Sequence, residues 1–222
     1  MEKISSKEEL AKMIDQSKFS PQATREEIRD FCQEAKRYNF NCLFVNPAFT
    51  SYAAKLLRET PIKVGAPIGF PLGATLPEVK AYEAKSALEN GAKELDMVIN
   101  IGALRSADYL LIEEEIRLIV RVAAGKVVKV ILETCFLSKN EIVKACEIAK
   151  EVGASFVKTS TGFGPGGATV EDVKLLRKCV GKEMGVKAAG GIRTFSEAMK
   201  FIKAGANRIG TSSGVAIVEG YR

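Results

Sequence analysis

Residues 127–134 read Val-Val-Lys-Val-Ile-Leu-Glu-Thr, and residues 155–159 read Ser-Phe-Val-Lys-Thr. Both are short runs rich in strand-forming residues. Between them, Ser138-Lys-Asn-Glu141 has the form of a capping box and precedes a run with the apolar spacing of a helix. A strand, a helix and a strand in this order form a βαβ unit, which indicates a parallel sheet.

The same alternation of β-rich and helical runs continues along the whole chain. The eight β-rich runs lie near residues 13–16, 42–46, 63–70, 94–100, 127–134, 155–159, 186–189 and 208–210. Eight such units suit either a closed barrel or an open doubly wound sheet, because periodicity alone does not separate the two.

Charged residues inside the runs favour the barrel. Four consecutive runs carry charged residues in their interiors, among them Asp96, Lys129, Lys158 and Lys187. In a closed barrel, inward residues alternate along each strand and reactive groups gather at the C-terminal mouth. The pattern therefore predicts an α/β protein built as one (β/α)8 TIM barrel, with residues 1–222 as a single domain.

These buried lysines also indicate a chemistry. An ammonium inside an apolar strand is costly unless it is paired or its pKa falls. One such lysine is usually a structural ion pair or a strand-end residue that reaches water, but three lysines and an aspartate on neighbouring strands favour a site. Two adjacent lysines suppress each other's protonation, so one of them can be a neutral amine that attacks a carbonyl.

The composition excludes several classes of enzyme, because the chain contains no histidine. A Ser-His-Asp hydrolase, a Cys-His protease and any metal site that needs imidazole are ruled out. General acid and base work falls to Lys, Asp, Glu, Tyr or water.

The net charge and the cysteine content limit which binding partners and which cellular compartment are expected. The formal net charge is +6, but the basic residues are interspersed with acids, so no nucleic-acid partner is expected. The five cysteines include no CxxC pair, the N-terminus has no apolar signal core, and no apolar run is long enough to cross a bilayer. We expect a reduced, cytoplasmic protein without a membrane partner.

Glycine-rich loops follow the sixth, seventh and eighth runs. The last two loops of a barrel are a common phosphate site, where backbone N–H groups meet the anion. The alternative is that these are tight turns, with residues 162–167 as a mobile lid. Two such loops in consecutive positions favour phosphate binding by Gly190, Gly191, Gly210, Ser212 and Ser213.

At residues 94–100, 129–134, 156–163 and 186–194 the sequence resembles the deoxyribose-phosphate aldolases, and the resemblance extends from the first run to the last. It implies a TIM barrel that reversibly cleaves 2-deoxy-D-ribose 5-phosphate to acetaldehyde and D-glyceraldehyde 3-phosphate. No metal or organic cofactor is implied. The family is commonly oligomeric, and Leu10, Phe19 and Tyr109 are candidate subunit contacts.

The resemblance also implies roles for individual residues. Lys158 would form the Schiff base, Lys187 would lower its pKa and act as a proton donor and acceptor, and Asp96 would donate and accept protons in the relay. Lys129 would support that network, while Asp15 and Thr159 would line the substrate site. The resemblance also implies that Gly162 would hold the phosphate, together with Gly190, Gly191, Gly210, Ser212 and Ser213 of the loops named above.

Three positions depart from the family's pattern or stay open. Gln16 stands where many members have a histidine, and Phe163 stands where some have a lysine that contacts phosphate. Tyr221 is a candidate for the tail tyrosine that assists proton transfer, although a residue so near the chain end is more often inert. The remaining alternatives are another phosphosugar barrel enzyme, either an isomerase or a different imine-forming aldolase, and a barrel that only binds its ligand.

Overall fold

The computed structural model describes residues 4–221, which form a closed barrel of eight parallel strands in sequence order. The strands are β1 (Ile14–Lys18), β2 (Cys42–Val45), β3 (Lys63–Ile68), β4 (Glu94–Val98), β5 (Val127–Ile131), β6 (Phe156–Lys158), β7 (Gly185–Ala189) and β8 (Arg208–Thr211). The barrel closes at β1, where Asp15 pairs with Cys42 of β2 on one side and with Gly210 of β8 on the other. The predicted (β/α)8 fold is confirmed.

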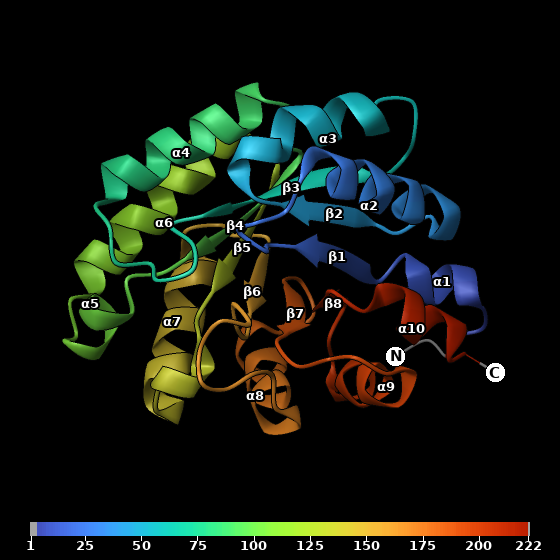
Figure 1. Cartoon of the computed structure of the whole chain (residues 1–222). Coiled ribbons are helices and arrows are strands. Elements are labelled where there is room, and N and C mark those ends of the chain that lie inside the picture. The colour runs from blue at the N-terminus through green and yellow to red at the C-terminus, as the bar shows by residue number, and fades with distance from the viewer. Residues whose placement is uncertain (1–3, 222) are drawn as a thin grey trace.

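Helices surround the strands on the outside of the barrel (Figure 1). They are α1 (Lys7–Ala11), α2 (Arg25–Tyr38), α3 (Thr50–Leu57), α4 (Pro77–Glu89), α5 (Ile101–Arg105), α6 (Tyr109–Ala123), α7 (Lys139–Glu151), α8 (Val170–Val180), α9 (Phe195–Ala204) and α10 (Gly214–Glu219), with short 3-10 helices η1 (Pro47–Phe49) and η2 (Thr134–Phe136). None of the helices in residues 4–221 is long and apolar enough to span a membrane.

Several helices begin at a side chain that satisfies their first N–H groups. The capping box predicted at Ser138 is present, since its hydroxyl accepts from the Glu141 N–H and the Glu141 carboxylate accepts from the Ser138 N–H. Thr24 and Thr194 begin α2 and α9 in the same way. Such caps stabilise a helix by about 1 kcal/mol each, and they fix where each loop of the mouth ends.

The strands differ from the predicted runs mainly at their C-terminal ends. β3, β4 and β5 end two or three residues before the runs do, because the last residues of each run turn into the mouth loops. Asn100 caps α5, accepting from the Ala103 N–H, and Glu133 adopts the left-handed conformation with φ 54°. The residues just past the strands are therefore free to face the site.

Strand residues alternate between the helix layer and the barrel interior. On β5, Val128 and Val130 pack in the hydrophobic core with the helices, whereas Lys129 points inward to the other charged groups. Leu10 is fully buried in that core, so its prediction as a subunit contact is wrong.

Candidate active site

Three lysines converge on one carboxylate inside the barrel. Lys158 Nζ lies 3.0 Å and Lys187 Nζ 2.8 Å from Asp96 Oδ2, and Lys129 Nζ lies 2.9 Å from Asp96 Oδ1. The strand register explains the convergence: Asp96 pairs with Lys129 across β4 and β5, and Lys158 pairs with Lys187 across β6 and β7. The structure brings together the four residues singled out from the sequence.

The surroundings of Lys158 favour its neutral form. Burial lowers the pKa of Lys158 most strongly, Asp96 raises it, and Lys187 and Lys129 lower it further, leaving a pKa of about 8. Burial raises the pKa of Asp96, but the charges of Lys129, Lys187 and Lys158 bring it far below its ordinary value. Asp96 is therefore a carboxylate, and Lys158 has a far larger fraction of neutral amine near pH 7 than an ordinary lysine.

Lys129 has the opposite balance. Burial disfavours its ammonium, but Asp96, Asp15 and Glu94 together raise the pKa of Lys129 above its usual range. Lys129 thus stays charged next to Asp96, while Lys158 can lose its proton.

Asp15 is a second buried carboxylate in the cluster. It lies 2.7 Å from Lys187 Nζ and 3.2 Å from an Arg208 nitrogen, and it accepts a hydrogen bond from Asn41. Burial raises the pKa of Asp15, but the charges of Lys187, Lys129 and Arg208 lower it below its ordinary value. Asp15 thus holds Lys187 between two carboxylates.

An aromatic ring completes the cluster. The Lys187 and Lys129 ammonium nitrogens lie 4.1 Å and 4.6 Å from the centre of the Phe44 ring, within cation–π range. The ring fits because residue 65 is glycine: a Cβ at Gly65 would lie 2.3 Å from it.

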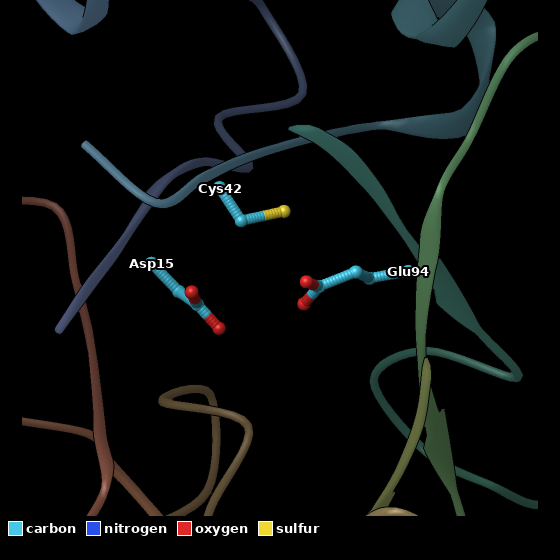
Figure 2. A group of neighbouring side chains, drawn as sticks. All are labelled: Asp15, Cys42 and Glu94. Atoms are coloured by element: carbon cyan, nitrogen blue, oxygen red, sulfur yellow. The ribbon is translucent and has the colours of Figure 1, made fainter. Parts of the chain in front are cut away.

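One group of possible metal ligands lies in the same interior. Asp15, Cys42 and Glu94 bring ligand atoms within 4.8 Å of one another (Figure 2). Lys129 Nζ lies 2.7 Å from Glu94 and 3.6 Å from Asp15, so an ammonium already neutralises these carboxylates. Burial also raises the pKa of the Cys42 thiol well above its ordinary value, which opposes the thiolate that a metal would need. The group belongs to the ion-pair network and does not fit a metal site.

A cavity of about 450 Å³ opens above the cluster at the C-terminal mouth. Lys158, Lys187 and Asp15 line it, whereas Asp96 and Lys129 lie beneath them, almost fully buried. Residues from the loops after β1, β6, β7 and β8 form the walls. A small carbonyl compound in this cavity would meet the Lys158 amine.

Five of the six predicted phosphate residues line the cavity: Gly162, Gly190, Gly191, Gly210 and Ser212. Ser213 does not line it, and its backbone N–H donates to the Thr211 hydroxyl as α10 begins. Thr159 is not a lining residue either. It is fully buried, and its hydroxyl bonds to the backbone of Ala189, tying β6 to β7.

Comparison with known proteins agrees with this site. Residues 9–220 match the model of the DeoC/LacD family of aldolases. The chain belongs to this family. It is 61% identical over 218 residues to the deoxyribose-phosphate aldolase of Thermococcus kodakarensis, covering 96% of this chain and 97% of that one. It is 57% identical over 215 residues to that of Carboxydothermus hydrogenoformans, covering 95% and 94%.

Solved structures agree with the sequence comparison. The tetrameric deoxyribose phosphate aldolase of Aeropyrum pernix superposes with a TM-score of 0.91 at 38% identity, over 97% of this chain and 92% of that one. A structure described as "QR15, an Aldolase" superposes at 0.92 with 42% identity, over 96% and 95%. An aldolase family assignment disfavours the isomerase alternative.

This DeoC/LacD family member has site residues that the sequence did not single out. Arg193 lines the cavity with an exposed guanidinium, and it follows Gly190 and Gly191 in a motif that should have drawn attention to it. Thr161 also lines the wall; its N–H and hydroxyl donate to the buried Glu133 carboxylate, which fixes the loop after β6. Only the fold reveals that contact, because 28 residues separate the two.

The departures from the family pattern have structural explanations. Gln16 accepts from the Gly214 N–H and donates to Glu34, so it anchors the loop after β8. Phe163 is exposed at the cavity rim and packs edge-on against Phe70. Tyr221 packs against Phe195 and does not line the cavity in residues 4–221.

Proposed function

We propose that this chain is a class I aldolase that reversibly cleaves 2-deoxy-D-ribose 5-phosphate to acetaldehyde and D-glyceraldehyde 3-phosphate, as in deoxyribonucleoside breakdown. The observation that carries the proposal is the Lys158 amine, which lines the cavity and has a pKa of about 8. A relative named for this activity is 61% identical over 96% of the chain.

The synthetic direction gives the steps in order. Neutral Lys158 Nζ attacks the carbonyl carbon of acetaldehyde, and the oxygen leaves as water to give an imine. The methyl carbon loses a proton to form an enamine, and this carbon attacks the aldehyde carbon of glyceraldehyde 3-phosphate while the aldehyde oxygen takes up a proton. Water then hydrolyses the new imine and releases the sugar phosphate and the free amine.

The neighbouring groups have different roles in proton transfer and charge stabilisation. Asp96 stays ionised, so it accepts hydrogen bonds from Lys158 and Lys187 and stabilises the cationic imine. Lys187 lines the cavity and is the candidate to pass protons to and from the adduct, directly or through water. Lys129, which is fully buried, supports Asp96 from below.

The phosphate of the substrate would bind at the loops after β6, β7 and β8. Gly162, Gly190, Gly191 and Ser212 line the cavity there and would donate backbone N–H groups, and Arg193 adds a cation. Arg193 would supply the charge that Phe163 lacks.

We also propose a single domain over residues 1–222, a cytoplasmic location and a homo-oligomer. A tetrameric relative supports the last. A row of exposed apolar side chains on and before α4, consisting of Leu72, Leu76, Val79 and Tyr82, supports it as well. Tyr109, another candidate contact, is also exposed, whereas Phe19 lines the cavity.

The test is to incubate the protein with acetaldehyde and borohydride, measure its intact mass and map the adduct by peptide analysis. An ethyl increment on Lys158 that is absent from Lys158→Arg would support the proposal. No adduct on folded protein, or adducts scattered over exposed lysines, would contradict it.

A further inference from the structure

The ion pairs of the site continue through the barrel to its opposite face. Beneath Asp96, Lys129 Nζ also lies 2.7 Å from Glu94 Oε2, and Glu94 Oε1 accepts a hydrogen bond from Lys63 Nζ at 2.9 Å. Glu94 is fully buried, whereas the Lys63 side chain is 42% exposed. Lys63 begins β3, so its ammonium lies at the end of the barrel opposite the mouth.

A second branch also ends on a cation near the surface. It runs from Lys187 through Asp15 to Arg208, which is 16% exposed and begins β8. The buried network thus has the Lys158 amine at the mouth of the barrel and two cations, Lys63 and Arg208, at its outer ends.

The charges of this network do not cancel. The groups that face Lys158 directly are Asp96, Lys187 and Lys129, and the outer ones are Asp15, Glu94, Arg208 and Lys63. When Lys158 is neutral, four cations still face three carboxylates. Protonating Lys158 adds a second excess charge in a medium of low dielectric, which is unfavourable.

We propose that Lys63 and Glu94 are positioning residues for the aldolase reaction: they hold Lys129 charged under Asp96, and the Lys63 cation helps to keep the Lys158 amine neutral. The inference rests on the proposed function in one respect: a neutral Lys158 amine benefits catalysis only if the chain is an imine-forming aldolase. Lys63 lies on the far face and touches no substrate, so any effect on Lys158 must travel through the network.

The test compares Lys63→Met with Lys63→Arg and with Lys93→Met. Lys93 is an exposed lysine next to Glu94 in the chain and lines the same surface hollow as Lys63, but it makes no ion pair within 4 Å in residues 4–221. Each protein is labelled with acetic anhydride across pH 6–10, and acetylation of Lys158 is followed by peptide mass. Labelling needs only a neutral amine, so this readout does not depend on aldolase activity.

We expect the labelling midpoint of Lys158 to rise by about half a pH unit in Lys63→Met, with about threefold slower labelling at pH 7. Lys63→Arg and Lys93→Met should match the parent. Arg208→Met, which removes the other outer cation, should also raise the labelling midpoint of Lys158. This variant replaces Lys63→Met in the test if Lys63→Met does not fold. Superimposable profiles for Lys63→Met and the parent, even with lowered stability, would overturn the inference. Failure of acetaldehyde trapping with a shifted midpoint would instead count against the proposed function alone.

Discussion

At the scale of single residues, the reactivity of Lys158 results from opposing effects on its pKa. Burial and two neighbouring lysines lower the pKa of Lys158, while Asp96 at 3.0 Å raises it, and the result is a pKa of about 8. A carboxylate alone would keep the lysine protonated, and lysines alone would leave no partner for the cationic imine. The combination gives an amine that is neutral when it attacks and stabilised once it carries charge.

Lys187 should control the pH at which Lys158 reacts. The rate of borohydride trapping by acetaldehyde should rise with pH through about 8 in the parent, because the amine must lose its proton. In Lys187→Met, the loss of a nearby cation should raise that midpoint by about one pH unit and slow trapping at pH 7 about tenfold. Lys174→Met, on the exposed face of α8, is the control. An unchanged or lowered midpoint would contradict the assigned role.

The buried amine should also cost stability. The pKa of Lys158 is about 8 in the folded protein against 10.5 as its ordinary value, so the unfolded chain binds this proton more tightly. This destabilisation of the folded state is complete below pH 8, and it disappears as the pH rises from about 8 to about 10.5. Lys158→Met should therefore raise the free energy of unfolding by about 1–3 kcal/mol at pH 7 and by much less at pH 10.5. Urea denaturation at both pH values measures the difference, and equal gains at the two would reject this explanation.

At the scale of strands and loops, the sequence predicted positions better than contacts. All eight strands lie where β-rich runs were found, because apolar spacing and glycine-rich turns are local features. The inward direction of Asp96 and the three lysines followed from parity. The Glu133–Thr161 contact and the burial of Thr159 depend on how loops from different strands meet, which no local pattern contains.

Gly210 of β8 contributes to the site because it has no side chain. It was predicted as a phosphate residue, and it also leaves room for the base of the site: a Cβ there would lie 2.9 Å from Lys187 Cε and 2.9 Å from Ala189 Cβ. Gly210→Ala should displace Lys187, lower kcat/KM for deoxyribose phosphate about tenfold or more, and destabilise the fold by about 1–3 kcal/mol.

The matched control for this substitution is Gly102→Ala in α5, where the nearest atom to a new Cβ is 3.5 Å away. It should leave activity unchanged and stability unchanged or slightly raised. Steady-state kinetics and thermal unfolding distinguish the two variants. Full activity in Gly210→Ala would show that Lys187 tolerates displacement.

At the scale of the whole molecule, helix α4 buries Ala84 and Ala87 in the core but departs from the usual pattern in its first half. Lys80 faces inward, fully buried, and its ammonium donates to the Val98 carbonyl at 2.8 Å and to Glu115 at 2.5 Å. Leu76, Val79 and Tyr82 face outward and are 66%, 49% and 76% exposed. Buried Lys80 beside exposed Val79 and Tyr82, with exposed Leu76 at the N-cap, is best explained if another protein surface covers the exposed side.

That surface is the expected contact between subunits. Leu76→Glu would place a charge in the middle of the apolar row, and burying that charge in an interface is unfavourable. Light scattering coupled to size exclusion should show a smaller assembly for Leu76→Glu than for the parent, while Lys174→Glu, a charge change on exposed α8, should leave the mass unchanged. Imine trapping on Lys158 should persist in Leu76→Glu, because the amine and its buried ion-pair partners all come from one chain. An oligomer of unchanged mass would place the subunit contact elsewhere and leave the outward face of α4 without this explanation.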